Sequence, residues 1–173
     1  YLQLVTQLGA DAIDFGSDTS FPGVSEQGYP DLDQLLQIKK KIYYWGLEIN
    51  RVTLPNITEK FMQDQPGGEV ELENTAKALR VFAEAGCPIA RQRFAGDTFP
   101  QLMTRYRSVH RGGYRSRGES RHLTPGNPDT PTIEQLEAWW DRFCQVYQTL
   151  VPIAEETGIR LAIHPSDVPN PDT

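Results

Sequence analysis

Residues 71–94 read ELENTAKALRVFAEAGCPIARQRF, and this stretch joins a helical pattern to a strand through one glycine. Its apolar residues recur at spacings of three to four, and charged residues fill the opposite face, as in a helix with one buried side. The apolar set is Leu72, Ala76, Leu79, Phe82 and Ala83, and the charged set is Glu71, Glu73, Lys77, Arg80 and Glu84. Gly86 then predicts a left-handed helix end, and a short apolar strand is expected directly after it.

The same arrangement occurs three more times along the chain. Residues 1–16, 31–52 and 132–165 each place a glycine between a helical segment and a short run rich in Ile, Val or Leu, at Gly9, Gly46 and Gly158. The fourth helix is expected to begin at Thr130-Pro131-Thr132, followed by an acidic first turn at Glu134. Short strands that alternate with long amphipathic helices predict parallel βα units, since parallel neighbours need a crossover. The fold class is therefore α/β.

Two α/β architectures compete, the doubly wound open sheet and the (β/α)8 TIM barrel. No G-x-G-x-x-G turn occurs in the chain, which favours the barrel. A barrel needs eight strands and about 250 residues, whereas this chain offers four strands after a helix that has no strand of its own. We therefore expect residues 1–173 to form a single partial barrel domain, equivalent to strands two to five. Residues are also expected before Tyr1.

Composition narrows the class of partner. The net charge is −6 and 38% of the residues are hydrophobic, values typical of a soluble protein that is neither a generic nucleic-acid binder nor a membrane-surface binder. The expected partner is a small molecule, and self-association into a homo-oligomer is left open. Cys87 and Cys144 form no C-x-x-C pair, so a reducing, cytoplasmic location is the default and both thiols are expected in the core.

Polar residues cluster where the predicted strands end, which is where barrel enzymes carry their active sites. They are Asp14, Ser17, Asn50, Arg51, Arg91, Arg93, His164 and Asp167. Arg91 and Arg93 stand at i and i+2, so one strand face carries both and they suit a carboxylate or a phosphate. The alternatives are that surface loops are polar anyway, and that these arginines pair with Asp or Glu at a frayed strand end.

Residues 96–131 make an unusually long connection that is rich in arginine. Arg105, Arg107, Arg111, Arg115, Arg117 and Arg121 alternate with Tyr106, Tyr114, His110 and His122. Long connections of this kind often act as active-site lids, and a lid over an anionic small substrate is the favoured interpretation. Arginine with aromatic residues can also bind single-stranded nucleic acid. A solvated loop without a chemical role is the third alternative.

His164 follows the last predicted strand, where a neutral imidazole is a ready ligand for a divalent metal. A general acid or base and a hydrogen-bonded structural histidine are the alternatives. Pro165 removes a backbone donor and helps to end the strand. The turn that follows can bring Asp167 back towards the same pocket.

The stretch GIRLAIHPSDVPNP, residues 158–171, resembles the strand and turn of the mannonate dehydratase family, whose corresponding stretch reads H-P-D-D-P-P. Residues 71–89 resemble the family's helix and strand before its active-site insertion. The H-P-x-D-x-P turn is the specific part of this resemblance. Sugar isomerases and epimerases of the xylose-isomerase-like barrel group share the rest.

The resemblance implies a metal-dependent hydro-lyase, typically using Mn²⁺, that converts D-mannonate to 2-keto-3-deoxy-D-gluconate in hexuronate and glucuronate catabolism. The family's motif histidine is a metal ligand and corresponds to His164. The second acidic position of the turn is kept as Asp167, a catalytic candidate, whereas Ser166 stands at the first. The family's other ligands, a cysteine, a histidine and an aspartate, come from later strands. Its Trp-Thr-Arg-Thr motif is replaced here by RQRFAGDTFPQLMTRYRSVH.

The leading hypothesis is a lyase acting on D-mannonate or a close analogue. His164 is its metal ligand, Asp167 its catalytic residue, and the substrate-binding set is Arg51, Arg91, Arg93 and Asp14. One alternative is a sugar isomerase or epimerase of the same barrel group, and another is a non-catalytic anion-binding module that uses the arginine-rich segment. Residues 1–173 alone are expected to bind divalent metal weakly and to catalyse little.

Overall fold

The computed structural model of the protein describes residues 1–16, 18–94, 104–120 and 132–163. These residues divide into two compact units. The larger unit contains a parallel sheet, its covering helices and most of the last helix. The smaller unit contains a two-stranded hairpin and the first turn of the last helix.

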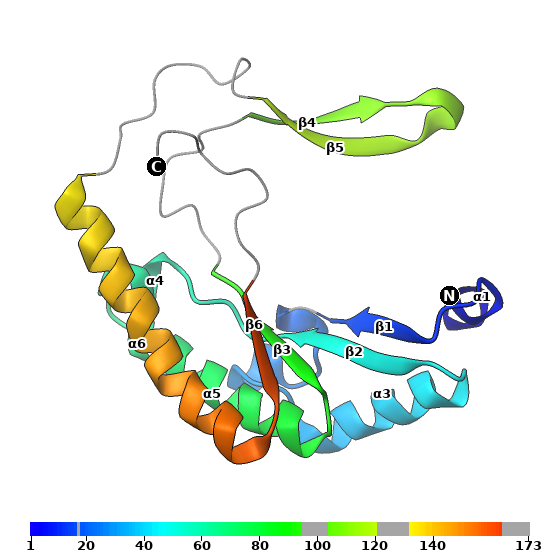
Figure 1. The fold of residues 1–173 in the computed structure, drawn as a ribbon, viewed down its shortest axis with the longest axis horizontal. Coiled ribbons are helices and arrows are strands. Elements are labelled where there is room, and N and C mark those ends of the chain that lie inside the picture. The colour runs from blue at the N-terminus through cyan, green and yellow to red at the C-terminus, as the bar shows by residue number, and fades with distance from the viewer. Residues whose placement is uncertain (17, 95–103, 121–131, 164–173) are drawn as a thin grey trace. The chain divides into compact units, whose positions relative to one another are not determined.

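Four helix-to-strand repeats build the larger unit, as the sequence predicts (Figure 1). They run from α1 (Leu2–Gln7) to β1 (Ala12–Phe15), from α3 (Leu32–Tyr44) to β2 (Glu48–Thr53), from α5 (Gly68–Glu84) to β3 (Ile89–Gln92), and from α6 (Ile133–Thr157) to β6 (Arg160–Ile163). The connections between them add η1 (Asp18–Ser20), α2 (Val24–Gln27) and α4 (Glu59–Met62). The glycines that close the four main helices all have positive φ, between 69° and 85°, which confirms the predicted helix ends.

The four strands form one parallel sheet in the order β1-β2-β3-β6. Each strand therefore lies next to the strand of the preceding repeat. Helices α3, α5 and α6 all lie on one face of this sheet (Figure 1). The expectation of an α/β fold with a parallel sheet is confirmed.

The core lies between the sheet and these helices. Val52 and Ala90 of adjacent strands are fully buried, as are Leu35 of α3 and Leu79 of α5. Phe21 packs edge to face against Phe15 and Phe82, which ties the connection after β1 to the sheet and to α5. Cys87 is buried as predicted, and burial raises the pKa of its thiol to about 11. Cys144 is half-buried.

Side-chain caps explain where two of the helices begin. The Asp31 carboxylate accepts a hydrogen bond from the Gln34 backbone amide at 2.9 Å and so caps α3. Thr132 and Gln135 exchange hydrogen bonds at the start of α6: the Thr132 hydroxyl accepts from the Gln135 amide, and the Gln135 carbonyl oxygen accepts from the Thr132 amide. This reciprocal capping box confirms the helix start that the sequence predicts.

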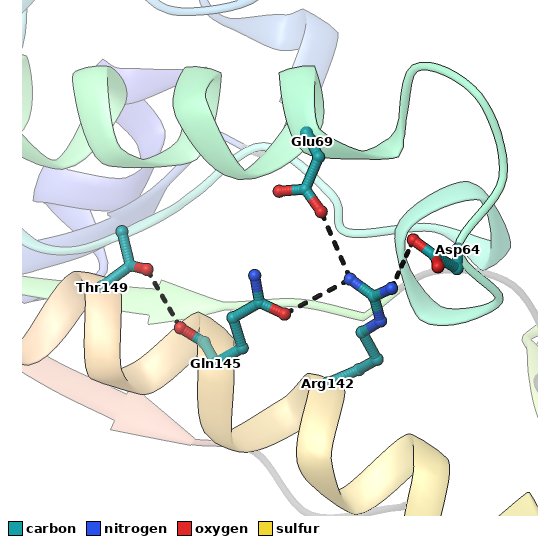
Figure 2. Close-up of polar contacts among 5 residues, drawn as sticks. All are labelled: Asp64, Glu69, Arg142, Gln145 and Thr149. Carbon is teal, nitrogen blue, oxygen red and sulfur yellow. Dashed lines mark hydrogen bonds and ion pairs between the residues drawn. The ribbon is translucent and has the colours of Figure 1, made fainter.

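Arg142 connects α6 to the segment between α4 and α5 (Figure 2). Its guanidinium pairs with Asp64 before α5 and with Glu69 in the first turn of α5, the latter at 3.2 Å. It also donates to the Gln145 side chain at 3.3 Å and lies 5.2 Å from the ring centre of Phe61 in α4. One side chain thus joins three helices.

The smaller unit contains an antiparallel hairpin that the sequence pattern does not predict. Within the arginine-rich connection, β4 (Thr104–Val109) pairs with β5 (Arg115–Ser120) around η2 (Arg111–Gly113). The side chains of Ser108, His110 and Ser116 form a hydrogen-bonded group that bridges the two strands. This segment is therefore not an irregular loop throughout. Arginines alternate with other residues in this segment, so neither face of either strand is apolar. The usual sequence signal of a strand is therefore missing.

No helix in the described ranges combines the length and the hydropathy that a membrane-spanning segment requires.

Candidate functional site

The carboxylate of Asp14 in β1 receives three hydrogen bonds from β2. The Asn50 side chain donates to Oδ1 at 2.9 Å. Arg51 donates to Oδ2 twice, from Nε at 3.1 Å and from Nη2 at 2.5 Å. Arg51 is 26% exposed and Asp14 is 49% exposed, so the pair is accessible to solvent.

A β-bulge explains how consecutive residues of one strand reach the same carboxylate. Ile13 pairs with Ile49, but the next residue, Asp14, pairs with Arg51, so Asn50 is the extra residue of β2. In a regular strand, side chains at neighbouring positions point to opposite faces. A bulge places two residues opposite one, and here both donate to Asp14.

The local electrostatics keep Asp14 ionised. Its pKa is lowered chiefly by the hydrogen bonds from Arg51, then by the one from Asn50, and the charge of Arg91 acts in the same direction. Charged side chains from β1, β2 and β3 therefore interact electrostatically with one another.

Strand register places Arg91 on the same sheet face as Arg51. Arg91 pairs with Thr53 across the β2–β3 ladder, and Thr53 stands two residues after Arg51. Paired residues share a face, as do residues two apart in one strand. This face is opposite to the one that carries the buried Val52 and Ala90, against which the helices pack. It therefore carries one acidic and two basic residues, together with the buried Thr53.

Four other residues are predicted at this site: Arg93, His164, Asp167 and Ser17. Arg93 follows the last residue of β3, and its side chain is exposed. His164 and Asp167 lie outside the described residues, as does Ser17. The structure thus brings together Asp14, Arg51 and Arg91 of the predicted set.

Two polar residues near this site were not assigned a role from the sequence. The sequence identifies Asn50 as a polar residue at a strand end, but no pattern in the sequence marks the bulge that turns it towards Asp14. Gln92 is buried at the end of β3, where its side chain donates to the backbone carbonyls of Pro55 and Arg93. It thereby connects the segment after β2 to the end of β3. A glutamine between two arginines in an apolar strand was the available signal.

The described residues were also tested as a metal centre. Within the ranges that the structure covers, no group of three or more His, Cys, Asp or Glu side chains could hold a metal ion. These residues therefore do not fit a metal site by themselves.

Comparison with known proteins points to one family. The family model described as D-mannonate dehydratase (UxuA) matches residues 131–173. Mannonate dehydratases from two strains of Streptococcus suis, 05ZYH33 and 98HAH33, are each 24% identical over 168 residues, covering 83% of this chain and 45% of the relative.

A solved structure shares the fold. The crystal structure of mannonate dehydratase from Streptococcus suis serotype 2 superimposes with a TM-score of 0.72 at 22% identity, covering 95% of this chain and 49% of that chain. The chain thus spans about half the length of the relatives it matches. The family model and the sequence relatives agree, so the resemblance of this chain to the mannonate dehydratase family, predicted from its sequence, is confirmed.

Proposed function

We propose that this chain contributes the substrate-binding face of a hydro-lyase that dehydrates a sugar acid. The expected reaction converts D-mannonate, or a close analogue, to 2-keto-3-deoxy-D-gluconate in hexuronate catabolism. Water leaves as a proton from the carbon next to the carboxylate and a hydroxide from the following carbon, and the resulting enol tautomerises to the keto acid. The observation that carries the proposal is the pair of arginines, Arg51 and Arg91, on one sheet face beside Asp14.

These arginines suit the chemistry of the carboxylate end. Removal of the proton next to a carboxylate shifts negative charge onto the carboxylate oxygens. Fixed cations that contact these oxygens stabilise the transition state more than the ground state. Arg51 and Arg91, with Arg93 at the strand end, are proposed to make these contacts, and Asp14 completes the site. Asp167 is proposed as the catalytic residue.

The proposal extends to the barrel and to the metal. We place β1, β2, β3 and β6 as strands two to five of a xylose-isomerase-like TIM barrel, because four consecutive parallel βα repeats match that order. His164 is proposed as the ligand of a divalent metal, with Mn²⁺ the expected ion, because it directly follows β6. The enzyme is expected in the cytoplasm.

The test is an assay of the full natural chain with D-mannonate. Formation of the 2-keto-3-deoxy acid would support the lyase function. If no such acid forms at millimolar D-mannonate, the lyase function on this substrate is wrong. The isomerase or epimerase alternative is followed separately, through solvent deuterium entering candidate sugars that are recovered without loss of water. Residues 1–173 alone are expected to bind Mn²⁺ weakly, because the family's other metal ligands come from later strands. Tight, stoichiometric binding in a titration would contradict this expectation.

Anion binding by the hairpin is a second candidate function, and strand register favours it. Arg107 lies directly opposite Arg117, and Val109 lies opposite Arg115 on the same face. Like charges in opposite positions destabilise a hairpin, and an isolated two-stranded hairpin is marginally stable. A bound anion would relieve that repulsion.

This second candidate predicts binding of a polyanion such as heparin that weakens steeply with salt. The binding should survive His164→Ala and be lost in Arg107→Glu. Binding that is insensitive to salt, or unchanged in Arg107→Glu, would remove the candidate.

A further inference from the structure

We propose that Asp14 and Asn50 act as positioning residues for Arg51, and that the bulge in β2 is the feature that brings the three side chains together. The inference rests on the proposed function, in which Arg51 binds the substrate carboxylate. It assigns Asp14 a role that operates through Arg51 instead of through direct contact with the sugar. It also adds Asn50 to the site.

The hydrogen bonds of Asp14 carry the first step. A carboxylate has about four acceptor positions. Three of the hydrogen bonds that Asp14 accepts come from Asn50 and Arg51, and they engage both of its oxygens. An aspartate bound in this way is poorly suited to accept further hydrogen bonds from several sugar hydroxyls.

The guanidinium geometry carries the second step. Arg51 uses its Nε and Nη2 groups on Asp14, so that contact occupies one edge of the planar guanidinium. The edge formed by Nη1 and Nη2 is the one we assign to the substrate carboxylate, because two parallel N–H groups match two carboxylate oxygens. Holding one edge on Asp14 fixes the direction of the other. It therefore reduces the side-chain entropy that substrate binding would otherwise cost.

The bulge carries the third step. Without the extra residue, Asn50 and Arg51 would alternate between the two faces of the sheet. The register shift between Ile13 and Asp14 lets both donate to one carboxylate. Asn50 engages Oδ1 and leaves Oδ2 to Arg51, which sets the rotation of the carboxylate. Bulges commonly redirect side chains beside active sites.

A double-mutant cycle in the full natural chain tests the inference. The variants are Asp14→Asn, Arg51→Lys and the double variant, with Arg80→Lys in the exposed pair with Glu156 as the matched control. The readouts are kcat and KM for D-mannonate and the Kd for D-gluconate by calorimetry. Asp14→Asn is expected to weaken binding about tenfold, the loss typical of a hydrogen bond to a charged group. Arg80→Lys is expected to change nothing.

The double variant decides the result. If Asp14 acts through Arg51, then adding Asp14→Asn to Arg51→Lys should weaken binding less than twofold further. A full tenfold additional loss would mean that Asp14 contacts the substrate itself and would overturn the inference. Asn50→Ala gives a second, milder readout: a KM raised several-fold with kcat nearly unchanged. An unaltered KM would contradict the role given to Asn50.

Failure of the proposed function can be told apart from failure of this inference. If D-mannonate is not turned over but D-gluconate binds and the cycle is non-additive, the lyase assignment fails and the positioning role stands. If neither acid binds to the wild type, Arg51 is not an acid-binding residue and the inference is wrong. Circular dichroism of each variant confirms that it is folded.

Discussion

At the scale of single residues, Asp14 is ionised near neutral pH because Arg51 and Asn50 hydrogen-bond to its charged form. A group whose pKa is lower in the folded protein than in the unfolded chain stabilises the fold once it is ionised. That contribution is fully present above the ordinary value of 3.8 and is lost as the pH falls through the lower folded value. Acid should therefore weaken this contact between β1 and β2.

The first prediction follows from that sign. Wild-type protein should be more stable than Asp14→Asn at pH 7, and the difference in unfolding free energy should shrink as the pH falls below about 4. Urea unfolding at a series of pH values measures both proteins. A difference that stays constant between pH 7 and pH 3 would show that Asp14 does not lose its charge in this range.

Residue types and their places at strand ends predict part of this site, whereas the partner of each side chain depends on the strand register. Asp14 and Arg51 are predicted because they stand at strand ends, and Arg91 because a charge in an apolar strand is rarely buried without a partner. The bulge that pairs Asn50 with Asp14 left no mark in the sequence, because one extra residue changes neither composition nor hydrophobic period. His164 and Asp167 stay predictions, since they lie outside the described residues.

At the scale of elements, the junction of α4, α5 and α6 depends on a few close contacts. Arg142 is 20% exposed, whereas Arg80 of the Arg80–Glu156 pair between α5 and α6 is 52% exposed. The carboxylates of both sets are exposed, at 77% for Asp64, 62% for Glu69 and 64% for Glu156, so the two sets differ in the burial of the guanidinium. Exposed ion pairs contribute little, because water solvates both charges well. A largely buried guanidinium that also packs on an aromatic ring contributes more.

Replacement of Arg142 gives the second prediction. Arg142→Ala should lower the free energy of unfolding by about 1–2 kcal/mol, because it removes several charge-assisted contacts and the packing of a largely buried side chain against Phe61. The matched control Arg80→Ala should cost less than about 0.5 kcal/mol. Urea denaturation of both variants provides the comparison. Equal losses would mean that burial does not distinguish these two pairs.

The start of α5 gives the third prediction. A Cβ at Gly68 would lie 2.6 Å from the Lys60 carbonyl oxygen and 2.7 Å from the Phe61 Cα, both of them backbone atoms. Alanine gains at most about 1 kcal/mol of helix propensity over glycine, whereas overpacking typically costs about 1–3 kcal/mol. Gly68→Ala should therefore be destabilising in thermal unfolding. Val70→Ala, at an exposed position of the same helix, is the control. A Gly68→Ala melting temperature at or above that of the wild type would contradict this packing.

The hairpin shows where element prediction from a pattern fails. The helices of the four repeats can be predicted because each has an apolar stripe and ends at a glycine. The hairpin has instead an arginine-bearing face and a face with Ser108, His110 and Ser116, so neither side looks buried. Strand recognition depends on one apolar face, and without it a strand resembles a loop.

At the scale of the whole molecule, the four repeats predicted the α/β class and the parallel sheet. Each helix end, at Gly9, Gly46, Gly86 and Gly158, is set locally by a backbone conformation that glycine favours. The order of the strands in the sheet follows the order of the repeats along the chain. Closure into a barrel needs eight strands, and the part of the chain that the structure describes supplies four parallel ones.

Uneven burial gives the fourth prediction. Helix α1 contains no buried residue, whereas β2, β3 and α5 supply much of the core. Hydrogen exchange at neutral pH should therefore exchange the α1 amides within seconds to minutes and the amides of β3 and α5 over hours. Rates in the unfolded chain provide the reference for each residue. Protection of α1 equal to that of β3 would mean that α1 unfolds only with the whole domain.

Strands β3 and β6 pair directly, although a long segment of the chain separates them in the sequence. The register runs from Ile89↔Arg160 to Gln92↔Ile163, and it is made by backbone pairing between the two strands. The length of the connection before α6 does not enter this pairing. Evolution can therefore lengthen, shorten or exchange residues 95–131 and leave the arginine-bearing strands in place. An insertion into this connection should therefore leave the ladder between β3 and β6 intact.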